Sequence, residues 1–403
     1  MKGMTKESFI EKAIAFYDKM REELDDTEQD FYEYEEKFDE LMTLFGKELL
    51  EEGLGSVPED IRKKKKIQTR FGKIAIAGTH RYSAAVQGYR ISPYLQERIV
   101  LAGQSEVYRL CTELINKFLR IDINDMQIHR VTNTYGELSA HIVGEQESMA
   151  LKDDSKQADV VYVQTDGSMV LTREEKWQEV KVGRIFRQND ILALSDKRQE
   201  VSESLYTAHL GGYDEFLKKF EPMVDVLDSL DSNLVFITDG ASWMRLWMCD
   251  NYPNALQILD FTHGIDHISA WLEYVEKDKK KRQQEFNIYK TLLLETGIKA
   301  VIKRIEETPV SLKTVEEERR KLLNYLNTNA YRMNYPDYLE RDLCIGSGAI
   351  EAAHRVIVQK RMKQSGQRWS EKRVQNMLNL KVANASGQWG KIVDMMRVTK
   401  KAA

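Results

Sequence analysis

The sequence predicts a mixed α/β (α+β) protein whose strands lie in the middle of the chain, with helices before and after them. Between residues 159 and 263, β-branched and aromatic residues form short runs that stop at an Asp, which is typical of strands. On either side of this region, apolar residues recur at helical spacing among many charged ones. The chain of 403 residues is long enough for two or three domains and for a sizeable core.

The charge of the chain limits the partners it can have. The net charge is −4, so the protein as a whole is not a polycation, and any surface for nucleic acid must be local. Acidic residues gather in residues 22–52, whereas basic residues gather in residues 62–66 and in the last third of the chain.

The cysteines and the hydropathy favour a cytoplasmic protein. Cys111, Cys249 and Cys344 lie far apart and form no Cys-x-x-Cys pair, which argues against a zinc ribbon and a disulfide framework. No apolar run approaches the ~18 residues of a membrane span. The start of the chain has no signal-peptide pattern, so we expect no membrane partner.

The N-terminal elements begin with a proline-free stretch, residues 5–52, that predicts two helices or one long broken helix. Residues 51–60 then read as a breaker. Residues 65–83 carry Ile74, Ile76 and Tyr82 around two glycines, which predicts a β-hairpin.

Residues 91–137 divide into three short helices. Pro93 suits the first turn of the first, Ser105 could cap the second, and Asn124 could cap the third over residues 125–135. A helix, a tight turn and a second, polar-faced helix form a candidate helix-turn-helix, with a plain three-helix packing unit as the alternative.

In the middle of the chain, residues 159–172, with a turn at Asp166-Gly167, and residues 179–188 predict an antiparallel meander. Residues 213–230 predict an amphipathic helix interrupted at Pro222. Two further strands are predicted, over residues 233–243 and 255–264.

The C-terminal part of the chain is expected to be mostly helical. Residues 264–343 are highly charged with helical spacing, and residues 370–386 predict a last helix. The residues from 391 onward are expected to fray.

Three acidic residues stand out as candidate ligands of a metal. Asp166 and Asp239 would meet if their strands are neighbours, and Glu351 follows Gly346-Ser347-Gly348, which permits a close approach of the backbone. Three carboxylates can hold two divalent ions about 3.5–4 Å apart for an in-line phosphoryl displacement. Oxygen ligands favour Mg²⁺ or Mn²⁺. The alternative is that each Asp-Gly is an ordinary turn and that Glu351 only complements a helix dipole.

A second feature is Asp260 with His263. His263 and His267 lie four residues apart, as in some zinc sites, but Gly264 stands where a His-Glu-x-x-His protease has Glu. A helix-capping Asp with a partnered histidine is the simpler interpretation.

Together these residues resemble bacterial insertion-sequence transposases of the DDE class, in the branch related to the Kra insertion sequences. The resemblance covers about residues 65–385, and its most specific part is the Ile-Gly-Ser-Gly-x-x-Glu block with the basic run that follows. The matching stretches are TDG at 165–167, ITDGASWMRLW at 237–247, ILDFTHGIDHI at 258–268 and residues 331–370. Relatives often carry a cysteine-rich segment early in the chain, and residues 65–82 here contain no cysteine.

The resemblance implies an RNase H-like mixed sheet with flanking helices and a helical insertion before the final Glu. The catalytic, Mg²⁺-binding residues would be Asp166, Asp239 and Glu351. His263 would orient a phosphate or a leaving group, and Asp260 would hold His263 in place. The chain would then comprise an acidic helical region (1–60), a β-hairpin region (61–90), a helix-turn-helix DNA-binding domain (91–150), the first part of the catalytic core (155–263), a helical insertion (264–343) and the second part of the core (344–390).

The same resemblance implies that DNA is the partner, as transposon terminal inverted repeats and as target DNA. In the helix-turn-helix the expected DNA contacts are Asn124, Gln127, His129 and Arg130. The cations expected to contact phosphates are Arg355, Lys360, Arg361, Lys363, Arg368 and Arg373; a solvated helix face is the alternative. Trp369 could stack on an unpaired base, or it could be a core residue.

We therefore expect a transposase, a homodimer when bound to DNA, in the bacterial cytoplasm and associated with the nucleoid. Two alternatives stay open. One is an RNase H-like nuclease of repair or recombination that uses the same metals. The other is a domesticated, non-catalytic DNA-binding relative.

Overall fold

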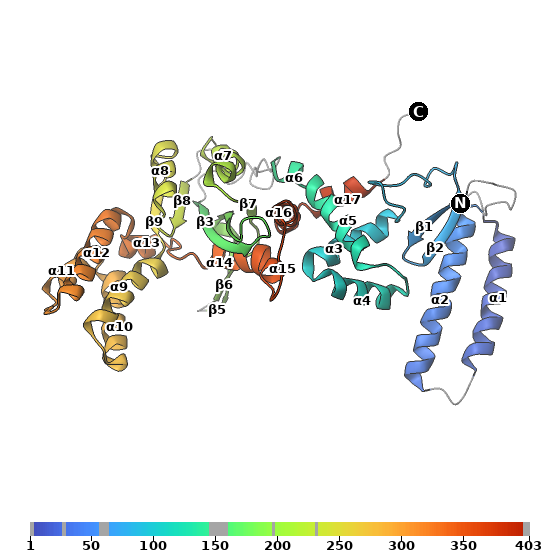
Figure 1. The fold of residues 1–403 in the computed structure, drawn as a ribbon, viewed down its shortest axis with the longest axis horizontal. Helices are drawn as coiled ribbons and strands as arrows, with labels where there is room; N and C mark the ends of the chain where they lie inside the picture. Colours follow the sequence, from blue (N-terminus) through green and yellow to red (C-terminus); the bar gives the residue numbers. More distant parts are fainter. Residues whose placement is uncertain are drawn as a thin grey trace. The chain divides into compact units, whose positions relative to one another are not determined.

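The computed structural model describes residues 4–25, 30–55, 64–144, 160–195, 198–229 and 233–397. The chain forms two compact units, Met1–Ala140 together with Gly387–Ala403, and His141–Ser386 (Figure 1). The predicted mixed α/β class is confirmed, because helices surround a five-stranded mixed sheet in the second unit.

The first unit opens with two helices, α1 (Lys6–Leu24) and α2 (Phe31–Gly53), as predicted. The rings of Phe16 and Phe45 stack between them at 4.2 Å. The predicted hairpin is also present, as β1 (Lys64–Thr69) and β2 (Gly72–Ala77), although Tyr82 lies outside it. Gly72 begins β2 at φ +97°, a conformation that favours glycine.

Three helices follow, α3 (Pro93–Ser105), α4 (Tyr108–Leu119) and α5 (Asp125–Leu138), before the short α6 (Ala140–Gly144). Pro93 occupies the first turn and Asn124 caps α5, both as predicted. The prediction for Ser105 is wrong. It lies in the last turn of α3, where its hydroxyl donates to Leu101 O, and Val107 precedes α4 without a side-chain cap.

The sheet of the second unit has the order β7-β4-β3-β8-β9. Its strands are β3 (Val160–Leu171), β4 (Trp177–Arg187), β7 (Leu205–Leu210), β8 (Asn233–Thr238) and β9 (Leu256–Leu259). β4 runs antiparallel to β3 and β7, whereas β3, β8 and β9 are mutually parallel. A separate hairpin, β5 (Ile191–Ser195) with β6 (Arg198–Val201), and strand β7 had not been predicted.

The predicted turn at Asp166-Gly167 is wrong. β3 continues through both residues, which pair with Val182 and Lys181 of β4, and the hairpin turn lies at residues 172–176. A hydrogen-bonded partner strand on one side therefore overrides the turn preference of Asp-Gly.

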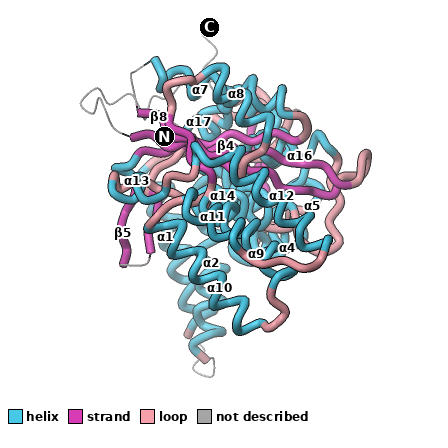
Figure 2. Tube along the Cα trace, turned by 90° about the vertical axis from the view of Figure 1, so that its left-hand side faces the viewer, coloured by secondary structure: helices cyan, strands magenta, loops and turns pink. Residues whose placement is uncertain are grey.

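Helices cover both faces of this sheet, and Figures 1 and 2 both show α7 (Tyr213–Ser229) and α14 (Gly348–His354) on opposite sides of it. α7 buries Phe216 and Phe220, with α8 (Ser242–Asn251), in a core against β3 and β8. Pro222 does not interrupt α7, contrary to prediction, because the helix continues through it.

Residues 264–343 are mostly helical, as predicted. They form α9 (Phe261–Val275), α10 (Lys279–Glu295), α11 (Ile298–Glu307), α12 (Lys313–Asn329) and α13 (Tyr335–Glu340). Buried residues such as Trp271, Tyr289 and Leu326 join these helices to Ile258 and Leu259 of β9 in one core.

After α14 the chain forms a π-helical turn (Arg355–Gln359), α15 (Lys360–Met362) and α16 (Glu371–Ala385). The expectation that residues from 391 onward fray is wrong as far as Met396. Residues Trp389–Met396 form α17, which buries Ile392 and Met396, and Trp389 Nε1 donates to Glu97 Oε1 at 3.2 Å in the first unit. Among the described residues, no helix is both long and apolar enough to cross a bilayer.

Candidate active site

Three aspartates lie at one level of the parallel strands. Gln164 of β3 pairs with Ile237 of β8, so continuing the register by two residues places Asp166 opposite Asp239. Thr238 pairs with Leu259 of β9, so the next residues along are Asp239 and Asp260. The predicted meeting of Asp166 and Asp239 at neighbouring strands is thus supported by the register, although only Asp239 and Asp260 lie at a strand end.

Asp166 is held from two sides. Gly167 N donates to its Oδ1 at 2.7 Å, and His354 Nε2 of α14 lies 3.5 Å from its Oδ2. Burial raises the pKa of Asp166, the charge of His354 opposes this, and the charge of Asp239 raises it further. Burial lowers the pKa of His354, which is 2% exposed. His354 was not among the predicted site residues, and the available signal was its position three residues beyond Glu351 on the same helix.

Asp239 follows β8 and accepts a hydrogen bond from Ala241 N at 3.0 Å. Gly240 between them has φ +93°, which suits glycine. The bond belongs to a turn at a strand end, which was the simpler interpretation of this Asp-Gly. The carboxylate of Asp239 is exposed, so the turn leaves it open to a ligand as well.

Asp260 caps α9 and is fully buried, with 0% exposure. Its Oδ2 accepts from His263 N at 3.0 Å and from His263 Nδ1 at 2.7 Å, while its Oδ1 accepts from Ser347 N at 2.8 Å. Burial alone would raise the pKa of Asp260, but the hydrogen bonds from His263 and Ser347 outweigh it and lower that pKa. The capping Asp with a partnered histidine is therefore present.

His263 is the charged member of this group. The hydrogen bond to Asp260 raises its pKa to about 9, and the charges of Asp239 and Asp166 act in the same direction. The ring is therefore an imidazolium at neutral pH. His267 instead packs on the Tyr325 ring at 3.9 Å, so the two histidines do not combine as ligands.

Glu351 reaches the site on α14, whose start is tied to the other elements. Phe261 N donates to Ile345 O at 2.9 Å, and Gln164 Nε2 donates to Gly346 O at 3.3 Å. Arg184 of β4, which the sequence reasoning had missed, donates to Ala349 O. Arg184 and Ala349 lie 165 positions apart, so no local pattern in the sequence indicates this contact.

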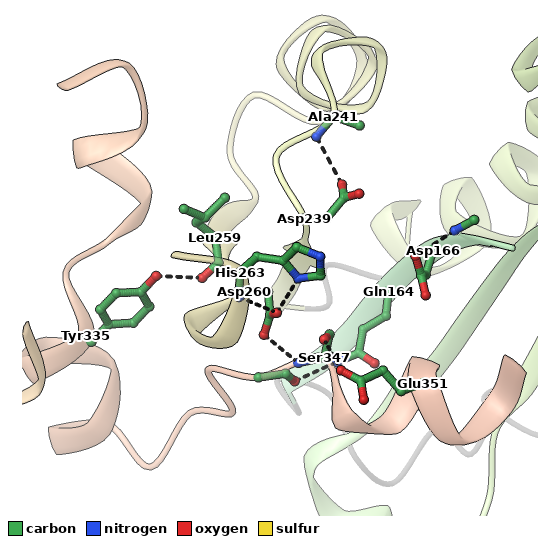
Figure 3. Close-up of polar contacts among 12 residues, drawn as sticks. Gln164, Asp166, Asp239, Ala241, Leu259, Asp260, His263, Tyr335, Ser347 and Glu351 are labelled. Carbon is green, nitrogen blue, oxygen red and sulfur yellow. Dashed lines mark hydrogen bonds and ion pairs between the residues drawn. The ribbon is translucent and has the colours of Figure 1, made fainter. Parts of the chain in front are cut away.

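The Glu351 carboxylate points toward Ser347, whose Oγ donates to Glu351 Oε1 at 3.2 Å, as Figure 3 shows. Within the part of the chain that the structure describes, no group of three or more His, Cys, Asp or Glu side chains is close enough to hold a metal ion. The charge of Asp239 contributes to the raised pKa of Asp166, and hard carboxylate oxygens suit Mg²⁺. For Glu351 to join them, its side chain would have to turn away from Ser347.

The candidate DNA contacts on the helix-turn-helix lie at the start of α5. Asn124 and Gln127 form a reciprocal capping box, with bonds of 2.9 and 3.0 Å, so both side chains already have a structural role. The His129 ring meets the Tyr108 ring edge-on at 5.2 Å, while Arg130 is exposed. DNA contact by these residues stays a prediction.

The basic run divides into exposed and buried members. Arg355, Lys360, Lys363 and Arg368 are exposed, and Arg373 is half-buried. The placement of Arg361 on the exposed basic surface is wrong, because it is 1% exposed and its guanidinium lies 4.8 Å from the Trp369 ring centroid.

Of the two alternatives for Trp369, the structure favours the core residue, because the side chain is 7% exposed and therefore not free to stack on a base. The π-helical turn before Arg361 is the physical reason for the error about that residue. It adds a residue to the turn and shifts every later side chain around the helix axis, which the 3.6-residue spacing does not anticipate.

Comparison of the chain with models of known protein families gave no match, and comparison with curated proteins gave none either.

Proposed function

We propose that this protein is a DDE-class DNA transposase, which cuts the ends of an insertion sequence and joins them to target DNA in a Mg²⁺-dependent reaction. The observation that carries the proposal is the common level of Asp166 and Asp239 on neighbouring parallel strands, with the helix of Glu351 bonded to the same sheet. Separate parts of the chain thus contribute carboxylates to one region.

The fold supports this proposal. A mixed five-stranded sheet with helices on both faces, and a helical region between Asp260 and Glu351, are what an RNase H-like core with an insertion before the last acid requires. Asp166, Asp239 and Glu351 would hold the metal. When bound, Mg²⁺ or Mn²⁺ would supply stabilisation of the attacking and leaving oxygens of an in-line displacement.

The other groups of the site suit a polyanionic substrate. The imidazolium of His263 adds a positive charge beside the carboxylates and can bind a phosphate oxygen. Lys363, Arg355 and Arg368 present exposed cations on the segment that follows Glu351. Such cations bind DNA through its phosphates, without reading the sequence. The helix-turn-helix candidate, α4 with α5, would then recognise the terminal repeats, and a homodimer would pair two ends.

A strand-transfer assay tests the proposal. The substrate is the DNA that flanks the gene, which should contain inverted repeats, with Mg²⁺ as cofactor. Glu351→Gln should lower the rate of cleavage by at least about 10²-fold, the scale of losing one group that stabilises a transition state. Glu340→Gln, an exposed glutamate on α13, is the matched control and should keep full activity.

Full activity of Glu351→Gln would contradict the proposed site. Cleavage of branched or single-stranded DNA without strand transfer would favour the repair nuclease instead. Tight binding to the ends without cleavage in Mg²⁺ or Mn²⁺ would favour a non-catalytic relative.

A further inference from the structure

A cavity of about 530 Å³ lies beside the strand that carries Asp166. One wall consists of Met169, Leu171 and Trp177 from the β3–β4 hairpin, and the other consists of residues 362–368, which begin with the last residue of α15. The volume lies within the range of about 300–1,000 Å³ that is usual for pockets that enclose a small ligand.

The loop of residues 363–369 is fixed against β3. Trp369 N donates to Leu171 O at 3.3 Å, and Arg173 N donates to Trp369 O at 2.8 Å. Lys363 Nζ also donates to Ser168 Oγ. β3 pairs with β8 only as far as Gln164, so this loop borders the part of β3 that extends beyond β8. The pocket is therefore a built feature of the fold.

The pocket is close to the candidate active site. Met169 lies three residues beyond Asp166 on one strand, and a strand rises about 3.3 Å per residue, so the two backbones are about 10 Å apart, with the two side chains on opposite faces of the strand. Lys363, which lines the pocket, reaches the face of Asp166, because its Nζ donates to the Oγ of Ser168, two residues beyond Asp166. A DNA strand whose phosphate lay at Asp166 would have a neighbouring nucleotide within reach of the pocket.

The side chains that line the pocket indicate what kind of ligand it can bind. Trp177 is 62% exposed and Met169 44% exposed, so an apolar, partly aromatic surface faces solvent. Among the described residues that line the pocket there are two cations, Lys363 and Arg368, and no carboxylate. Gln364, Ser365 and Gln367 add amide and hydroxyl groups. Arg368 is exposed, so its charge is accessible to a ligand.

We propose that this pocket receives one unpaired nucleobase of the DNA, which stacks on Trp177. A base offers a flat apolar face for the indole and polar edges for the amides, and its phosphates match Lys363 and Arg368. An acidic peptide would satisfy the cations but would leave the exposed indole without a flat partner. The inference rests on the proposed function and deepens it, because it names the ring that holds a nucleotide next to the cut. The buried Trp369 stabilises the loop of residues 363–369, and Trp177 is the ring on which the base stacks.

The test is a binding experiment in the full chain that needs no catalysis. The protein carries Glu351→Gln, no metal is added, and the probe is a mixed-sequence single strand of about 15 nucleotides with one 2-aminopurine, because stacking tolerates any sequence. Trp177→Ala should weaken binding about ten-fold and abolish the quenching of 2-aminopurine, since one stacked base contributes ~1–3 kcal/mol.

Two further variants separate stacking from a general effect. Trp177→Phe retains a ring and should retain most of the affinity and quenching. Leu312→Ala removes an equally exposed apolar side chain, 63% exposed, from another part of the same unit, and it should bind as the parent does. A duplex of the same sequence should lose less affinity on Trp177→Ala than the single strand does.

Single-strand binding and quenching that are unchanged in Trp177→Ala would overturn the pocket proposal. That result would leave the proposed function standing, because end cleavage depends on Asp166, Asp239 and Glu351. Failure of the parent protein to bind either single strands or duplex DNA would instead overturn both.

Discussion

The segment from Cys344 to Trp369 contains two regions that are held in different ways. The first, residues 344–354, carries Glu351 and is fixed by hydrogen bonds to buried or partly buried partners, above all the bond from Ser347 N to Asp260. The second, residues 355–369, carries most of the cations, and four of them point into solvent. Buried side chains such as Ile357, Arg361 and Trp369 anchor it from within.

This difference indicates which residues of the segment stabilise the fold and which are available to bind a ligand. A buried polar group that loses its hydrogen-bond partner costs the full desolvation penalty of that group, whereas the removal of an exposed cation costs little stability. Substitutions of the buried residues that hold the helix of Glu351 should therefore lower the stability of the protein. Substitutions of the exposed cations should change DNA binding and leave stability nearly unchanged.

The largest effect is expected for Asp260→Ala. It removes a buried carboxylate that accepts three hydrogen bonds, and it leaves the N–H groups of His263 and Ser347 without their acceptor. The free energy of unfolding should fall by about 3 kcal/mol, as measured by urea denaturation. Asp278→Ala is the control, because Asp278 caps α10 in the same manner but is exposed, and it should cost about 1 kcal/mol or less. Equal losses in the two variants would refute the anchoring role of Asp260.

The second prediction compares Arg361 with Arg368 inside the basic region. Arg361→Ala removes a buried guanidinium over Trp369 and should lower the free energy of unfolding by about 2 kcal/mol. Arg368→Ala should leave stability within about 0.5 kcal/mol, and it should reduce the slope of log affinity for DNA against log salt concentration by about 1. Denaturation and salt titration of both variants check this, and a stable Arg361→Ala with a reduced slope would reverse our assignment.

Much of this fold was predictable because its signals are local. The strands before Asp239 and Asp260 are short apolar runs, and Asn124 forms a capping box with a residue three positions on. These features depend on neighbours in sequence, so a single chain reveals them.

Other features depended on contacts distant in sequence. The path of β3 through Asp166-Gly167 is set by pairing with β4, and the inward turn of Arg361 by a π-helical turn. The bond between Ser347 and Asp260 joins residues 87 positions apart. Local spacing in the sequence carries no information about such distant partners. These partners determine which carboxylates come close together in the fold.

The smallest expected effect is the pH dependence of the bond between His263 and Asp260. The pKa of His263 rises from 6.5 to about 9 in the folded protein, chiefly through that bond. The stabilisation is therefore complete below about pH 6.5, where the unfolded chain also carries the charge, and it is lost as the pH rises toward 9. Because the ring is about half exposed, we expect a loss of only about 1 kcal/mol. An NMR titration of His263 measures the pKa directly, and Asp260→Asn should return it toward 6.5 if the variant folds. A His263 that titrates near 6.5 in the parent protein would show that Asp260 is held by Ser347 alone.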